Sequence, residues 1–163
     1  MSIADKPALY RELADQLAAL IEGEPDLIAN AGNMAALIYH GLPQLNWAGF
    51  YFAKETRELV LGPFQGKPAC VRIPWGQGVC GTAAARRETL VVPDVHDFPG
   101  HIACDPNSRS ELVVPLITAG EVLGVLDLDS PVRDRFEDDD RAGCERLVAV
   151  FLEHQNRYSA ELP

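Results

Sequence analysis

The sequence predicts a single α+β domain with a central antiparallel sheet, N- and C-terminal helices packed on one face and site loops on the other. Two observations predict this class. Apolar residues recur at helical spacing near both ends of the chain, and short apolar segments separated by turn residues fill the middle. At 163 residues the chain has the length of one domain, residues 1–163, which can bury a core without help from disulfides.

Three long helices are expected, two before the strands and one after them. The N-terminal segment, about residues 1–22, has leucines at helical spacing that predict a helix from about Lys6 to Glu22. A second helix is expected to begin at Asp26 and to stop before Gly41. The last helix is expected over about residues 138–158, and Cys144 lies on its apolar stripe, which indicates a buried core residue.

The middle of the chain predicts short strands joined by turns. The expected strands are Trp47–Lys54, Leu59–Gly62, Ala69–Ile73, Thr89–Val92, Leu112–Ile117 and Val122–Leu128. Residues Ala119 and Gly120 are expected to turn the last pair into a hairpin. An alanine-rich segment, 78–87, predicts a short helix with Cys80 near its start, where exposed N–H groups favour an anion and would lower the pKa of a thiol.

Charge and hydropathy narrow the partners. The formal net charge is −10 with only 14 Lys and Arg residues, which argues against nucleic acid or an anionic membrane as partner. The first residues lack a basic region followed by an apolar run, and no apolar stretch approaches the length that spans a bilayer. We therefore expect a soluble cytoplasmic protein that acts on a small molecule.

Three of the four cysteines, Cys70, Cys80 and Cys104, lie within one stretch rich in Gly, Pro and polar residues. Loops on a rigid scaffold are where chemistry usually takes place. A second thiol within reach turns an oxidised cysteine into a disulfide that can be reduced again. This grouping predicts thiol redox chemistry.

A metal site is the competing interpretation of the same stretch. Cys70, Cys80, His96, His101 and Cys104 could in principle hold zinc. The sequence contains no CxxC or HExxH pair to supply the usual paired ligands, so no metal is expected.

Carboxylates and aromatic residues outside this stretch are candidate binding groups. Asp127 and Asp129 share one side of a strand, and they either cap the following turn or form a cluster that needs a proton or a cation between them. Glu111 is either a surface ion-pair partner or a third member of that cluster. Trp47 and Tyr51, four apart on a strand, are either core residues or an aromatic wall for a ligand.

These residues stand in a pattern that resembles the free methionine-(R)-sulfoxide reductases, which are GAF-domain enzymes. The matching motifs are Asn46–Tyr51, Gly62–Cys70, Gly78–Ala84, Val92–His96, Pro99–Asp105, Ser108–Glu111 and Gly124–Ser130. The resemblance covers nearly the whole chain after the first helix, and every motif occurs in order.

The resemblance implies a GAF-like domain that reduces free, not protein-bound, methionine-(R)-sulfoxide and is recycled by thioredoxin, without a cofactor. It makes Cys104 the attacking cysteine, Cys70 the principal resolving cysteine and Cys80 a third redox participant. It assigns substrate binding to five further residues, namely Glu111, Asp127, Asp129, Trp47 and Tyr51. It also implies a homodimer, paired through the terminal helices.

Two other classes of function compete with this one. A sensory GAF module would bind a ligand such as a cyclic nucleotide without reacting, and it would have no need for three loop cysteines. A thiol redox switch or peroxide scavenger would need the cysteines but not the acidic and aromatic residues.

Overall fold

The computed structural model describes residues 5–101 and 104–161. Its helices are α1 (Lys6–Ile21), α2 (Leu27–Gly41), α3 (Gly78–Arg86) and α4 (Asp138–Glu161), with a short 3₁₀ turn, η1, at Val95–Asp97. Its strands are β1 (Trp47–Lys54), β2 (Glu58–Gly66), β3 (Arg72–Pro74), β4 (Leu90–Val92), β5 (Ser110–Thr118) and β6 (Glu121–Ser130). The element order matches the sequence prediction.

The strands form one antiparallel sheet in the order β3-β2-β1-β6-β5-β4. The long strands β1 and β6 lie at its centre, so the segments that begin and end the sheet region become neighbours. Ala119 and Gly120, with φ of 51° and 77°, make the predicted turn between β5 and β6.

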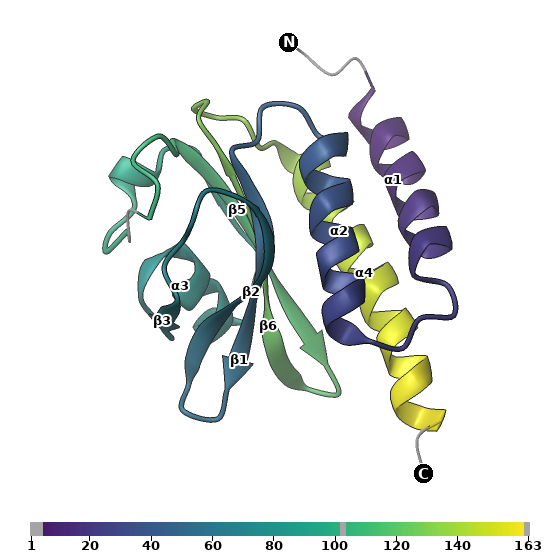
Figure 1. The fold of residues 1–163 in the computed structure, drawn as a ribbon. Helices are drawn as coiled ribbons and strands as arrows, with labels where there is room; N and C mark the ends of the chain where they lie inside the picture. Colours follow the sequence, from purple (N-terminus) through teal and green to yellow (C-terminus); the bar gives the residue numbers. More distant parts are fainter. Residues whose placement is uncertain (1–4, 102–103, 162–163) are drawn as a thin grey trace.

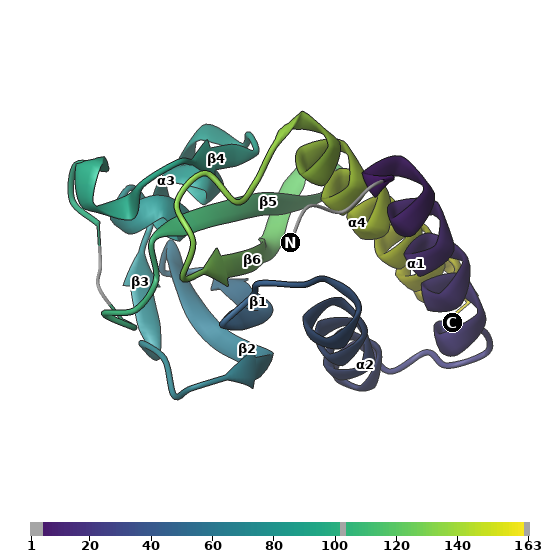
Figure 2. The same ribbon diagram turned by 90° about the horizontal axis from the view of Figure 1, so that it is seen from above.

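Helices α2 and α4 cover one face of the sheet, and α1 packs on these two helices from the outside. Helix α3 and the loops around it lie against the other face (Figures 1 and 2). Alternation along β6 separates the two sides. Leu126 and Leu128 are fully buried in the core beneath the three long helices, whereas Val125 belongs to the smaller core beneath α3. The predicted fold class, with helices on one face and loops on the other, is confirmed.

Local sequence explains where the first two helices begin. The Asp5 carboxylate accepts a hydrogen bond from the Ala8 N–H at 2.9 Å, and the Asp26 carboxylate accepts one from Ala29 at 2.8 Å. Each satisfies an N–H group that has no partner inside its helix. Asp26 is therefore the cap of α2, and the helix proper begins one residue later than predicted.

Two strand predictions were wrong in their bounds. The strand predicted at Leu59–Gly62 continues to Gly66, because its last residues pair with the start of β1, with Trp47 opposite Gly66. The strand predicted at Ala69–Ile73 is only Arg72–Pro74. Residues 67–70 instead leave the sheet, and this departure brings Cys70 to the site.

A buried carboxylate joins α1 to α4. Asp140, which is fully buried, accepts hydrogen bonds from Lys6 at 2.6 Å, Tyr10 at 2.8 Å and Arg135 at 3.0 Å. It also accepts a hydrogen bond from the N–H of Glu137 at 2.9 Å, which precedes the helix. We call Asp140 and these four partners the Asp140 network.

Cys144 is fully buried on the same side of the molecule, and its Sγ lies 3.8 Å from the Tyr10 hydroxyl, which confirms the prediction that it is a core residue.

None of the helices in the described part of the chain combines the length and the apolar composition that crossing a membrane requires.

Candidate active site

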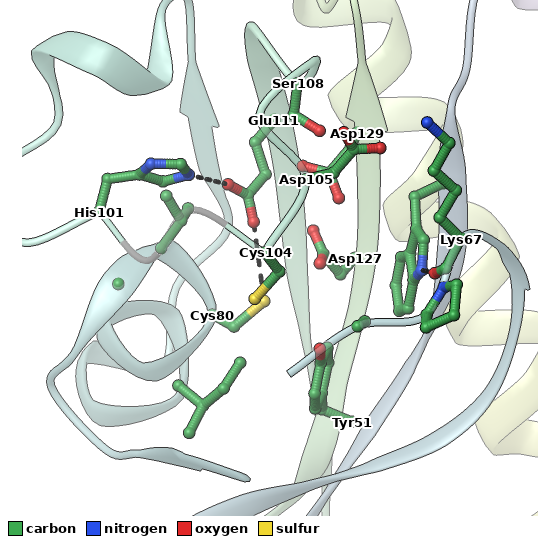
Figure 3. A pocket seen from close by; sticks show the side chains of 16 residues that line it. Tyr51, Lys67, Cys80, His101, Cys104, Asp105, Ser108, Glu111, Asp127 and Asp129 are labelled. Atoms are coloured by element: carbon green, nitrogen blue, oxygen red, sulfur yellow. Dashed lines mark hydrogen bonds and ion pairs between the residues drawn. The ribbon is translucent and has the colours of Figure 1, made fainter. Parts of the chain in front are cut away.

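A pocket opens on the α3 side of the sheet and encloses about 550 Å³, its open mouth included. Segments from β1, from the loops after β2 and η1, and from α3, β5 and β6 meet in it (Figure 3). Its lining residues are Trp47, Tyr51, Lys67, Pro68, Ala69, Ile73, Gly78, Val79, Cys80, His101, Cys104, Asp105, Ser108, Glu111, Asp127 and Asp129. All predicted site residues line this pocket except Cys70, which lies beside it.

Cys70 is joined to Cys104 by a disulfide, with the two Cα atoms 5.7 Å apart. Cys70 follows the loop that leaves β2, and Cys104 lies in the loop before β5, so the bond connects two loops on opposite sides of α3 in the sequence. Both cysteines are half-buried. The stretch that predicted thiol redox chemistry thus contains an oxidised pair beside a cavity.

The three predicted carboxylates converge in the pocket, and we call Glu111, Asp127 and Asp129 the acid cluster. Strand register explains the convergence, because Glu111 on β5 pairs directly with Asp129 on β6, and Asp129 pairs with Trp47 on β1. Glu111 and Asp127 are buried, with 6% and 5% of their surfaces exposed. The cluster interpretation of Glu111 and of the two aspartates is confirmed.

Burial raises the pKa of each carboxyl group in the acid cluster, and the charge of Asp127 adds to the effect on Glu111 and Asp129. Burial, reinforced by the charges of its two acidic neighbours, raises the pKa of Glu111 well above its usual range. Burial raises the pKa of Asp127 to about 6, and burial with the charge of Asp127 raises the pKa of Asp129. In the described part of the chain no lysine or arginine forms an ion pair with these carboxylates.

The prediction for the Cys80 thiol was wrong in direction. Cys80 is the third residue of α3, but it is buried, and its Sγ donates to Glu111 Oε1 at 3.7 Å. Burial, together with the charges of Asp127 and Glu111, raises the pKa of this thiol well above its usual value. Desolvation and nearby carboxylates outweigh any benefit from the helix start, so Cys80 is a neutral hydrogen-bond donor here.

Trp47 and Tyr51 form the predicted aromatic wall of the pocket. Their rings stack with centroids 5.8 Å apart, and Trp47 stacks in turn on Phe64 at 5.2 Å. Gly49 lies between them on β1 and opposite Asp127, and a side chain there would collide with Phe64. The missing side chain leaves room for Phe64, which stacks on Trp47.

The pocket also contains polar residues that the sequence analysis did not assign to it. His101 Nε2 lies 3.8 Å from Glu111 Oε2 (Figure 3), and burial lowers the pKa of its imidazole. Asp105 and Ser108 both accept hydrogen bonds from Asn46, at 3.2 Å and 3.0 Å. In the sequence, only their position in the same loop as Cys104 pointed to these two residues. The folded structure shows that both line the pocket.

One group could hold a metal ion, although it is not the one considered from the sequence. Donor atoms of Cys80, Glu111 and Asp127 lie within 4.8 Å of one another. Cys70 and Cys104 are joined in the disulfide, and His96 is exposed and is not among the residues that line the pocket. The same three groups, when protonated, can donate hydrogen bonds to a small polar oxygen.

The arrangement suits a two-electron reaction at a polar, oxygen-bearing small molecule. The Cys70–Cys104 disulfide lies at one side, carboxyl groups with raised pKa values at another and stacked aromatic rings at a third. A carboxyl group with a raised pKa can deliver a proton near neutral pH, where an ordinary carboxylate cannot.

Comparisons with known proteins point the same way. The model of the GAF domain family matches residues 8–152, which include every segment that lines the pocket. Protein YtsP of Bacillus subtilis is 58% identical over 150 residues, covering 91% of this chain and 90% of that protein. The free methionine-R-sulfoxide reductase of Escherichia coli is 51% identical over 145 residues, covering 89% of this chain and 87% of that protein.

A solved structure extends the similarity to three dimensions. Free methionine-R-sulfoxide reductase from Neisseria meningitidis, determined in complex with its substrate, superposes with a TM-score of 0.93 at 42% identity. The match covers 99% of this chain and 97% of that one.

Proposed function

Because the chain belongs to the GAF-domain free methionine-R-sulfoxide reductases, we propose that it reduces free L-methionine-(R)-S-oxide to L-methionine. The observation that carries this proposal is the Cys70–Cys104 disulfide beside a pocket that also contains the acid cluster and the aromatic wall. A sensor would need only the pocket, and a peroxide scavenger only the cysteines.

The first step is an oxygen transfer from the substrate to Cys104. The Cys104 thiolate attacks the electrophilic sulfur of the sulfoxide while a carboxyl group of the acid cluster gives a proton to the oxygen. The hydroxyl group then passes from the methionine sulfur to the Cys104 sulfur as the bond between the two sulfurs and the original S–O bond break. The methionine sulfur thereby gains two electrons and leaves as the thioether, and Cys104 loses two and becomes a sulfenic acid. Glu111 suits the donor role, because its pKa is raised and Cys80 and His101 flank its two oxygens.

The second step resolves the sulfenic acid. The Cys70 thiolate attacks the Cys104 sulfur, the S–S bond forms, and the oxygen leaves as water after taking up a proton. The dithiol of thioredoxin then reduces the disulfide, so the enzyme needs no bound cofactor. Cys80 is the third redox participant of this proposal, and in the oxidised form its thiol orients Glu111.

Selection of the free amino acid follows from charge. The α-ammonium group of free methionine sulfoxide is absent from a residue inside a polypeptide. Asp127, Asp129 and Asp105 line the pocket, and a bound ammonium group would favour the ionised forms of Asp127 and Asp129 and pair with them. The S-methyl group would lie against the aromatic wall, and the shape of the pocket would select the R epimer.

The cellular setting is also proposed from chemistry. A disulfide that must be reduced in every turnover requires a reducing compartment, which favours the cytoplasm. We expect a homodimer paired through α1 and α4, and sedimentation would test it.

A coupled assay tests the activity. The protein, racemic methionine sulfoxide, thioredoxin, its reductase and NADPH should consume NADPH to a plateau at about half of the substrate, since one epimer is reduced. Cys104→Ser should abolish turnover, and Cys70→Ser should lose thioredoxin-supported turnover. If the protein binds methionine sulfoxide but NADPH is not consumed, the result would instead support a sensor that binds its ligand without reacting.

A further inference from the structure

The segment of residues 67–70, which carries Cys70 from β2 to the pocket, has little support from the main chain. Among the described residues, no hydrogen bond between two backbone groups involves residues 67–70. Pro68 has no N–H group to offer. Something else must hold this segment if Cys70 is to stay within bonding distance of Cys104.

Both residues of the aromatic wall hold it, one at each end. The Trp47 Nε1–H donates to the carbonyl oxygen of Lys67 at 3.1 Å, and the Tyr51 hydroxyl donates to the carbonyl oxygen of Cys70 at 2.9 Å. Each aromatic residue thus presents its ring to the pocket and its polar atom to the cysteine-bearing segment.

Trp47 and Tyr51 are rigidly held, so their donor groups can fix the position of residues 67–70. Trp47 and Tyr51 are 4% and 2% exposed, lie on the central strand β1 and stack on each other. Burial, reinforced by the charges of Asp127 and Cys80, raises the pKa of Tyr51 further above its usual value, so its hydroxyl keeps its proton. The Tyr51 hydroxyl is therefore a hydrogen-bond donor at neutral pH, and the Trp47 N–H does not titrate there.

We propose that Tyr51 and Trp47 are positioning residues for the resolving cysteine: their side-chain donors hold residues 67–70 so that Cys70 reaches the Cys104 sulfenic acid. This inference rests on the proposed function and adds a second role to the substrate-binding wall. It predicts that the two donors act on disulfide formation, the step in which Cys70 attacks sulfur and water leaves.

The decisive measurement is the lifetime of the Cys104 sulfenic acid. Hydrogen peroxide can generate it without methionine sulfoxide, since the thiolate takes one oxygen from peroxide and hydroxide leaves. Rapid mixing with a sulfenic-acid probe, followed by mass spectrometry, gives the rate at which the sulfenic acid disappears and the disulfide appears. Using peroxide separates this test from the proposed substrate.

Tyr51→Phe and Trp47→Phe remove the donors and keep aromatic rings in the wall. Each should slow disulfide formation by about 3- to 10-fold, because a hydrogen bond contributes on the order of 1 kcal/mol to holding a segment. Tyr39→Phe, on α2 across the sheet, is the matched control and should leave the rate unchanged. Thermal unfolding checks that each variant is folded. If only one of the two aromatic variants folds, the rate measured with that variant is enough to test the proposal.

The same substitution in a Cys70→Ser background separates positioning from other effects. If Tyr51 acts through Cys70, then Tyr51→Phe should not change the sulfenic-acid lifetime once Cys70 is absent, so the two effects are not additive. An unchanged lifetime in Tyr51→Phe and Trp47→Phe alone, or an equal change with and without Cys70, would overturn the inference. Failure of the methionine sulfoxide assay alone would overturn only the proposed function.

Discussion

The molecule buries carboxylates in two regions and treats them in opposite ways. On the helical side of the sheet, Asp140 receives hydrogen bonds from two cations, a hydroxyl and a backbone N–H. Burial alone would raise its pKa, but these donors together hold the pKa below its usual value. On the other side the acid cluster has no such cation among the described residues, and its pKa values are raised.

The difference separates a carboxylate that stabilises the fold from carboxyl groups kept available for chemistry. A buried charge that is fully paired contributes to a unique structure, whereas unpaired buried acids cost stability and persist where a ligand or a proton completes them. Asp127 illustrates the second case, because its Oδ1 atom is buried without a hydrogen-bond partner among the described residues.

The largest effect is expected when the proposed proton donor of the acid cluster, Glu111, is replaced. Glu111→Gln keeps the shape but cannot donate a carboxylic proton, so single-turnover formation of methionine should slow by about 10²- to 10⁴-fold. Because the raised pKa keeps the acid protonated, wild-type rates should hold at low pH and fall as pH rises through that pKa. A Glu111→Gln rate close to wild type would assign the proton to another group.

The next largest effect is expected when the buried ion pairs of Asp140, on the helical side of the sheet, are broken. Asp140→Asn leaves Lys6 and Arg135 without their buried partner, and we expect a loss of about 3–5 kcal/mol in unfolding free energy by urea denaturation. Well below its melting temperature the variant should keep wild-type turnover. Glu137→Gln, which alters only the exposed partner of Lys6, is the matched control and should cost far less. Equal losses in the two variants would contradict the contrast.

A smaller effect of opposite sign is expected in the acid cluster. Because the folded pKa of Asp127, about 6, exceeds its unfolded value, its favourable contribution is full at acid pH and is lost as pH rises through about 6. Asp127→Asn should therefore raise stability by about 1–3 kcal/mol at pH 8, since a tenfold change in proton affinity corresponds to about 1.4 kcal/mol. At pH 4, close to the unfolded pKa, the gain should fall to about 0.5 kcal/mol, and it should vanish at lower pH. Thermal unfolding at pH 8 and pH 4 would show this difference, and a gain as large at pH 4 as at pH 8 would exclude this cause.

The smallest effect is expected where a carboxylate is simply exposed. Arg141 and Glu145 form a surface pair one helical turn apart on α4, with almost half of each side chain exposed. Arg141→Ala should change the unfolding free energy by no more than about 0.5 kcal/mol. A loss of several kcal/mol would show that burial is not what distinguishes the three groups.

The sequence predicted the fold well because alternation and helical spacing are local signals. The Leu126-Asp127-Leu128-Asp129 alternation on β6 correctly indicated two leucines in the core and two carboxylates together on the other face. The strand bounds near residues 66–72 failed, because pairing of Gly66 with Trp47 is a long-range event that no local pattern shows.

The residues that the sequence analysis proposed for the site gather at one pocket, but the sequence did not indicate their electrostatics. The wrong direction for Cys80 arose because burial and the approach of Glu111 are properties of the folded chain. His101 and Asp105 were missed as pocket residues for a similar reason, since a loop gives no periodic signal of the direction in which its side chains point.

The Cys70–Cys104 disulfide also changes the covalent connectivity of the chain. Cys70 and Cys104 are 34 positions apart, so their bond closes a ring that contains α3, β4 and Cys80. By the usual relation between ring size and chain entropy, such a closure stabilises a folded protein by about 4 kcal/mol. In the catalytic cycle proposed above, each turnover would convert an open chain into a ring and back, so resistance to heat would report the fraction of the protein that carries the disulfide.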